Sequence, residues 1–173
     1  GYYSRMTSSG HLNDFFTAPA AHPSYGALLS LQMEEMWHIL GRPSRFAIVE
    51  AGAGAGLLSE DILQYVSYLD HGFQKAVQYF AIDRSAPYQR KGVTTSKIAG
   101  FPVMRIQATG IPLLGITGCV LSNELLDAMP VHRVTVSEGR LKELFVGYMN
   151  GQFVEVIGEP STSALETRLR EED

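Results

Sequence analysis

Three glycines at alternate positions form the feature that most constrains this sequence. Gly52, Gly54 and Gly56 follow the apolar run Phe46–Glu50 and precede a segment in which apolar residues recur at helical spacing. A glycine has no Cβ, so the backbone can turn sharply there and a ligand can approach it closely. Such a loop between a strand and a helix is typical of nucleotide binding, but a tight turn of small residues explains the same letters.

The first two thirds of the chain alternate predicted helices and strands, which is the pattern of a parallel sheet with crossover helices. Apolar spacing predicts two helices, at 24–40 and 57–69. Short apolar runs bounded by turn residues predict four strands, at 46–50, 76–82, 101–106 and 116–121.

From Val131 onward the period changes to an alternation of apolar and polar residues, which predicts half-buried strands. The two dipeptides Glu138-Gly139 and Asn150-Gly151 separate these runs, and such dipeptides favour hairpin turns. The sequence therefore predicts an antiparallel β meander with strands at 131–136, 141–148 and 153–157.

Composition limits the classes of function. The chain has 173 residues, of which 45% are hydrophobic, so it can form one sizeable core. Its net charge of −4 argues against a nucleic-acid partner, because phosphate binding favours a basic excess. Cys119 is the single cysteine and the five histidines lack ligand spacing, so we expect no disulfide and no metal site. No apolar run is long enough to predict a membrane-spanning helix.

The residues around the glycine loop discriminate between cofactors. The loop lacks the Gly-Lys-Ser/Thr of a Walker motif, and the dinucleotide fingerprint would require a glycine where Leu57 stands. Glu50 precedes the loop, where it suits an ammonium group better than a pyrophosphate. Asp83 follows the second strand, where an acid can accept both ribose hydroxyls, although a loop cap is the alternative. S-adenosylmethionine fits best, and its expected site consists of Glu50, Gly52, Ala53, Gly54, Gly56 and Asp83.

An acidic segment follows the fourth predicted strand, at the sheet edge where ligands of open α/β folds bind. If 124–127 forms one helical turn, Glu124 and Asp127 share a face and can hold a guanidinium group. The alternative is a helix start with Asn123 as its cap and the two acids interacting with the helix dipole. We take Asn123, Glu124 and Asp127 as the candidate catalytic residues.

The motifs at 13–19, 49–56 and 123–132 together resemble the MidA family of class I S-adenosylmethionine-dependent methyltransferases. This family includes the mitochondrial complex I assembly arginine methyltransferase, and the resemblance runs in order from about residue 1 to 156. Glu143 also matches a family position on the meander. The resemblance implies a substrate site that includes Thr17, Pro19, His132 and Glu143.

The resemblance implies a Rossmann-like, three-layer αβα core. We expect residues 1–130 to form the N-terminal part of this domain, 131–158 a meander inserted in it, and 159–173 a polar tail. Since the family continues further, we expect the chain to be an N-terminal fragment. Ala20 and Ala55 depart from the usual family residues, which are glutamate and arginine respectively.

The resemblance also implies a function, which is methyl transfer to an arginine of a protein substrate such as a respiratory complex I subunit. The expected location is the cytoplasm, or the mitochondrial matrix in a eukaryote, and a homo-oligomer is left open. Two alternatives remain. One is a non-catalytic assembly factor that keeps the cofactor fold and binds a partner, and the other is an NAD-binding oxidoreductase.

Overall fold

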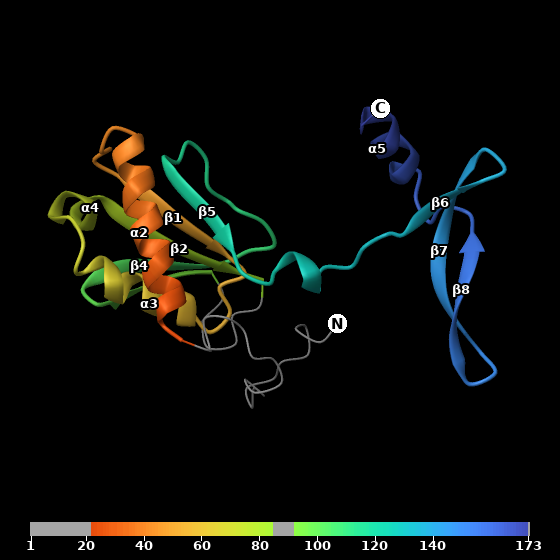
Figure 1. Cartoon of the computed structure of the whole chain (residues 1–173), viewed down its shortest axis with the longest axis horizontal. Helices are drawn as coiled ribbons and strands as arrows, with labels where there is room; N and C mark the ends of the chain where they lie inside the picture. Colours follow the sequence, from red (N-terminus) through yellow and green to blue (C-terminus); the bar gives the residue numbers. More distant parts are fainter. Residues whose placement is uncertain (1–21, 85–91, 173) are drawn as a thin grey trace. The chain divides into compact units, whose positions relative to one another are not determined.

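The structure is a computed structural model of the chain, and it describes residues 22–84 and 92–172. The chain divides into two compact units, Gly1–Asp127 and Ala128–Asp173 (Figure 1). We refer to them as unit 1 and unit 2 and describe each by itself. The predicted assignment of the meander to the same domain as the glycine loop stays a prediction.

Unit 1 is built on a five-stranded sheet with the order β3-β4-β2-β1-β5. Its strands are β1 (Phe46–Ala51), β2 (Val77–Asp83), β3 (Val93–Ile98), β4 (Phe101–Gln107) and β5 (Gly118–Ser122). β1 runs parallel to both β2 and β5, and β2 runs parallel to β4, whereas β3 pairs antiparallel with β4 at the edge. The predicted mixed α/β fold with a parallel sheet is confirmed.

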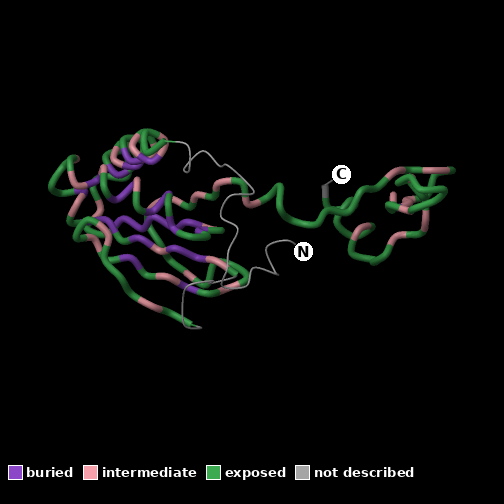
Figure 2. The backbone as a smooth tube through the Cα atoms, turned by 90° about the horizontal axis from the view of Figure 1, so that it is seen from below, coloured by how far each residue is buried: buried purple, intermediate pink, exposed green. Residues whose placement is uncertain are grey.

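Three helices contribute to the main core of unit 1, which lies on one face of this sheet (Figure 2). They are α2 (Ser24–Ile39), α3 (Leu57–Val66) and α4 (His71–Ala76). The buried side chains are mostly large and apolar, because a closely packed helix–sheet interface excludes water. The largest of them, fully buried, include Phe46, Ile48, Ile62, Leu63, Phe73 and Tyr79.

The opposite face of the sheet has a smaller apolar cluster formed by Ala47, Val49, Ile82 and Ile106. Within the described residues, the side chains packed against this cluster come from β2 and from the 108–113 segment, not from a helix.

The structure corrects the predicted secondary structure in two places. The helix predicted over 57–69 ends at Val66, and a separate helix, α4, begins at His71. The Asp70 side chain caps α4 by accepting hydrogen bonds from the Gly72 and Phe73 amides. β3 was not predicted, because its sequence VTTSKI is mostly polar and its side chains are mostly exposed.

Unit 2 is a three-stranded antiparallel sheet followed by a helix. Its elements are β6 (Val134–Ser137), β7 (Arg140–Met149), β8 (Gln152–Gly158) and α5 (Ala164–Glu172). The predicted turns have left-handed backbone at both central residues, with φ of 53° and 71° at Glu138-Gly139 and 52° and 81° at Asn150-Gly151. These values match the hairpin turns that such dipeptides favour.

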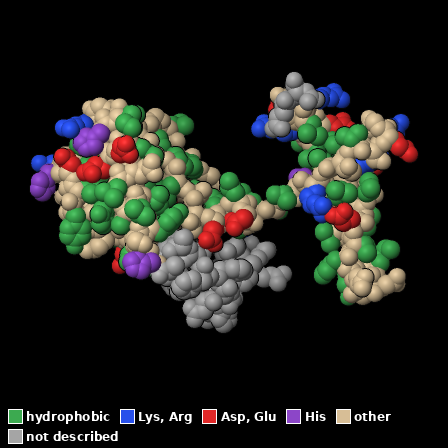
Figure 3. Space-filling model, in the orientation of Figure 1, with side chains coloured by type: hydrophobic (Ala, Val, Ile, Leu, Met, Phe, Trp, Pro, Cys, Tyr) green, Lys and Arg blue, Asp and Glu red, His purple; other side chains and the backbone are tan. Residues whose placement is uncertain are grey.

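Unit 2 has little apolar interior. Of its described side chains, only Glu143 is buried, whereas Val146, Tyr148 and Phe153 are exposed. Figure 3 shows hydrophobic side chains on the visible surface of this sheet. No helix in the described part of the chain is long and apolar enough to cross a membrane.

Candidate functional site

The glycine loop connects β1 to α3 and has the backbone conformation that its glycines allow. Gly52, Gly54 and Gly56 have φ of 78°, 50° and 90°. These values lie in the left-handed region, which costs a residue with a side chain about 1–2 kcal/mol. The Gly52 and Ala53 amides donate hydrogen bonds to the Ile82 carbonyl at 2.8 and 3.1 Å. The loop is therefore attached to the carboxyl end of β2.

Asp83 lies at the end of β2, and its side chain also contacts the loop. Its Oδ2 atom accepts a hydrogen bond from the Gly54 amide at 2.9 Å. The structure thus brings Asp83 and the glycines together, as the sequence predicted for a shared site. The loop-capping alternative is realised in this contact, and the predicted ribose contact stays a prediction.

Glu50 is the last buried residue of β1 and has 4% of its surface exposed. The Tyr79 hydroxyl donates a hydrogen bond to Glu50 Oε2 at 2.9 Å. Burial raises the pKa of Glu50 to about 7, since loss of water disfavours the charged form, while the Tyr79 hydrogen bond and the Arg105 charge oppose this shift. The nearby Asp83 charge raises it slightly. The pKa of Glu50 thus lies near neutral pH instead of in the ordinary range of a carboxyl group.

Two residues of this site were missed by the sequence analysis, Tyr79 and Arg105. A Cβ atom built on Gly56 would lie 2.7 Å from Arg105 Nη1, so the guanidinium group lies directly against that glycine. Glu50 pairs with Ala81 on β2, and Ala81 pairs with Arg105 on β4, so the three side chains point to the same sheet face. Side chains two positions apart in a strand lie on the same sheet face, so the spacing of Tyr79 and Ala81 in β2 could have indicated that Tyr79 lies on the face of Glu50.

The acidic segment follows β5 but does not form the predicted turn. Glu124 has a left-handed φ of 48°, and the helical residues are limited to the 3₁₀ turn Leu126–Ala128. The predicted shared helical face of Glu124 and Asp127 is therefore wrong, because the backbone changes direction at Glu124. Both side chains are exposed, and Asn123 is half-buried.

The same segment lies close to the glycine loop through one apolar contact. A Cβ atom on Gly52 would lie 2.9 Å from Leu125 Cδ1, so the Leu125 side chain packs against Gly52. The residues after β5 and the loop after β1 thus meet at the carboxyl edge of the sheet, where neighbouring parallel strands end.

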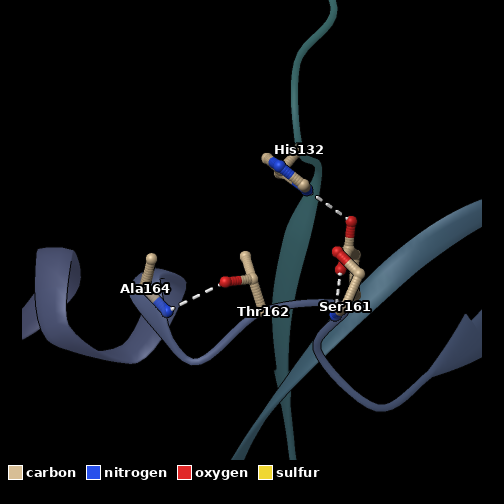
Figure 4. Close-up of polar contacts among 5 residues, drawn as sticks. His132, Ser161, Thr162 and Ala164 are labelled. Carbon is tan, nitrogen blue, oxygen red and sulfur yellow. Dashed lines mark hydrogen bonds and ion pairs between the residues drawn. The ribbon is translucent and has the colours of Figure 1, made fainter.

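Two of the predicted substrate residues, His132 and Glu143, contact each other in unit 2 (Figure 4). His132 Nδ1 donates to Glu143 Oε1 at 2.7 Å, and the Ser161 amide donates to Glu143 Oε2 at 2.6 Å. The hydrogen bonds from His132 and Ser161 lower the pKa of Glu143 to about 2. A role of this pair in substrate binding stays a prediction, as does that of Thr17 and Pro19, which lie outside the described residues.

Within residues 22–84 and 92–172, no group of three or more histidine, cysteine, aspartate or glutamate side chains could hold a metal ion. Cys119 is half-buried, and burial raises the pKa of its thiol to about 11, so the thiol stays protonated at neutral pH.

Comparison with known proteins identifies the family. Residues 28–172, most of the chain, match the model of the family described as "Putative S-adenosyl-L-methionine-dependent methyltransferase". The chain belongs to this family. The description of the family names the cofactor that the glycine loop suggested, S-adenosylmethionine.

Relatives of known name are much longer than the chain. The chain is 25% identical to the mitochondrial protein arginine methyltransferase NDUFAF7 homologue of Drosophila melanogaster and 25% identical to human NDUFAF7. Each match covers 84% of the chain but only 37% and 38% of those proteins. The chain thus spans less than two fifths of the length of these relatives.

A solved structure resembles the fold over nearly the whole chain. It is a COG1565 superfamily member from Burkholderia thailandensis, whose structure contains bound S-adenosyl-homocysteine. The TM-score is 0.62 at 24% identity, and the match covers 98% of the chain and 44% of the other protein. This likeness supports the class I methyltransferase fold.

Proposed function

We propose that this chain forms the S-adenosylmethionine site of a methyltransferase that modifies an arginine side chain of a protein substrate. One observation supports this most strongly. The loop at 52–56 has three left-handed glycines, follows a strand, begins a helix and is attached to Asp83 at the carboxyl edge of the sheet. The family match and the names of the two relatives agree with this chemistry.

The residues present fit the cofactor. The glycines leave the loop backbone accessible, because Gly52 and Gly54 are exposed and have no side chain. Glu50 can interact with a cationic amino group and Asp83 with ribose hydroxyls, and Ala53 contributes loop backbone. The cofactor supplies an activated methyl group, so the protein has mainly to align donor and acceptor and to stabilise charge.

Asn123, Glu124 and Asp127 would hold the acceptor. An arginine side chain is charged at all ordinary pH values, since its pKa exceeds about 12, and a site without acids would pay for its desolvation. Two exposed carboxylates in the segment that contacts Gly52 through Leu125 can offset that cost. The left-handed backbone at Glu124 turns this residue out of the helical path, so the two acids approach the substrate separately.

The proposed partner is a protein, because both named relatives are protein arginine methyltransferases. A respiratory complex I subunit is the specific substrate that we propose from the family resemblance. The relatives are mitochondrial proteins, so we propose the mitochondrial matrix for a eukaryotic source and the cytoplasm otherwise.

Calorimetry tests the cofactor. S-adenosylhomocysteine and NAD are titrated separately into the chain under the same conditions. We expect saturable heat with the former only. Binding of NAD alone would favour the oxidoreductase alternative and would contradict the methyltransferase.

Substitution of Glu124 tests the acceptor site. Glu124→Gln keeps the shape and removes the charge, so we expect methyl transfer to fall at least about 100-fold while S-adenosylhomocysteine affinity is unchanged. Glu60→Gln, at an exposed position on α3, is the matched control and should change neither quantity. An equal loss of cofactor affinity in Glu124→Gln would assign this residue to the donor site instead.

A second candidate function is partner binding without catalysis. The observation that favours it is the exposure of Val146, Tyr148 and Phe153 in unit 2, since large exposed apolar side chains mark interaction surfaces. The two functions differ in the Glu124→Gln experiment. S-adenosylhomocysteine binding with no methyl transfer before or after the substitution would support the non-catalytic function.

A further inference from the structure

The protonation of the buried Glu50 carboxyl group depends on a neighbouring residue, Tyr79. Tyr79 lies on β2, two residues before Ala81, and has 1% of its surface exposed. Its hydroxyl donates to Glu50 Oε2 at 2.9 Å. Since Ala81 is the register partner of Glu50, Tyr79 occupies the same sheet face one pleat below the carboxyl group. The side chain of Glu50 is therefore hydrogen-bonded to a buried residue of the neighbouring strand β2.

The charges around Glu50 come from the neighbouring strands. Arg105 on β4 stabilises the ionised carboxyl group, and Asp83 at the end of β2 disfavours it. Cys119 on β5 faces Tyr79 and is protonated at neutral pH, because burial raises the pKa of its thiol to about 11. Of the three helices packed on this face, α2 and α3 have four half-buried titratable side chains, which are Tyr25, Glu34, Asp61 and Tyr65, whereas the titratable side chains of α4 are exposed.

Near neutral pH, Tyr79 stays the hydrogen-bond donor and Glu50 the acceptor. Burial and the Glu50 charge raise the pKa of Tyr79 well above its ordinary value, so its hydroxyl keeps its proton. A hydroxyl that always donates favours the ionised form of its acceptor. Removal of this donor would leave the buried carboxylate with less compensation and would raise the pKa of Glu50.

We propose that Tyr79 is a positioning residue of the cofactor site, and that through its hydrogen bond to Glu50 it sets the pH range in which the site accepts a cationic amino group. This inference rests on the proposed function, because the amino group is that of the cofactor's methionine portion. When this group arrives, Glu50 loses its proton to solvent, and the resulting carboxylate pairs with the bound ammonium. The O–H bond of the carboxylic acid is the bond that breaks in this step, its proton goes to water, and no bond of the cofactor changes.

The inference predicts a specific pH profile for Tyr79→Phe. If loss of the hydrogen bond raises the pKa of Glu50 by about one unit, S-adenosylhomocysteine affinity falls about tenfold relative to the unsubstituted chain at pH 6 but only about twofold at pH 8. A merely structural role would lower affinity equally at both values. Tyr68→Phe removes a hydroxyl from an exposed tyrosine and should leave the profile unchanged.

Two measurements test this step separately from the proposed function. Calorimetry in buffers of different ionisation enthalpy counts released protons, and we expect about half a proton per site at pH 7 and more in Tyr79→Phe. In the ligand-free chain, the ¹³C resonance of the Glu50 carboxyl group should titrate near pH 7 and at a higher pH in Tyr79→Phe. An unchanged midpoint overturns the inference, whether or not the cofactor binds. If the midpoint shifts but S-adenosylhomocysteine does not bind, the cofactor assignment is wrong. The role of Tyr79 in cofactor acceptance is then wrong as well.

Discussion

Among the residues that the structure describes, each unit contains one buried glutamate, and the pKa values of the two are shifted in opposite directions from the ordinary value. Glu50 in unit 1 has 4% of its surface exposed and Glu143 in unit 2 has 5%. Nevertheless the pKa of Glu50 is raised to about 7, whereas that of Glu143 is lowered to about 2. Burial alone therefore does not determine the charge of a carboxyl group in this protein.

The difference lies in the hydrogen-bond donors. Among the described residues, Glu50 receives one hydrogen bond, from the neutral Tyr79 hydroxyl, and this does not outweigh the cost of burial. Glu143 receives hydrogen bonds from His132 and from both the amide and the side chain of Ser161. A carboxylate with several donors is stabilised in its charged form. Glu143 thus has the environment of a carboxylate that stays ionised, and Glu50 that of a carboxyl group whose pKa lies near neutral pH.

The largest expected difference between the two units is the loss of stability when a phenylalanine is replaced by alanine. Phe46 is fully buried between the sheet and α4, where its ring contacts Phe73. Phe46→Ala should lower the free energy of unfolding of unit 1 by about 3–5 kcal/mol, because it leaves a cavity. Urea denaturation followed by the fluorescence of Trp37, the single and buried tryptophan, measures this change.

The matched substitution in unit 2 is Phe153→Ala, at a position with 80% of its surface exposed. We expect a change within about 0.5 kcal/mol, since little apolar surface is buried there. Equal losses at the two positions would mean that unit 2 buries Phe153 in solution and would remove this contrast.

The stability advantage of Glu50→Gln over the unsubstituted chain should grow as the pH rises. Because the pKa of folded Glu50, about 7, is above its ordinary value of 4.5, its contribution is fully present below pH 4.5 and is lost as the pH rises through 7. Glutamine stays neutral and avoids this loss. Relative to the unsubstituted chain, the variant should gain about 3 kcal/mol by pH 8. Denaturation curves at pH 5 and pH 8 measure the gain, and a pH-independent difference would contradict the raised pKa.

Glu143→Gln should have the opposite pH dependence. Because the pKa of folded Glu143 is depressed to about 2, its contribution is present above the ordinary value of 4.5 and is lost as the pH falls through 2. The variant should therefore be less stable than the unsubstituted chain at pH 7, and the difference should shrink in acid. Hydrogen exchange of the Leu144 amide, which donates to the Arg133 carbonyl, measures unit 2. Equal protection at pH 7 would mean that the His132 and Ser161 contacts do not stabilise this unit.

The sequence by itself determined the features that depend on local backbone preference. The left-handed conformations of Gly56 and of Asn150-Gly151 follow from residue type, so the loop and the hairpin turn could be predicted. Apolar periodicity likewise located α2 and the parallel strands β1, β2 and β4 within a few residues. The motif resemblance then indicated the family, which the family model confirmed.

Only the tertiary structure decided the state of the site. Tyr79 and Glu50 are 29 positions apart, and Arg105 meets Gly56 from a strand that follows it by more than 40 residues, so no local pattern joins them. The missed strand β3 is polar because its side chains are mostly exposed, and it exists through its pairing with β4. The pKa of a carboxyl group depends on which side chains exclude water and which donate to it, and that depends on packing between distant segments.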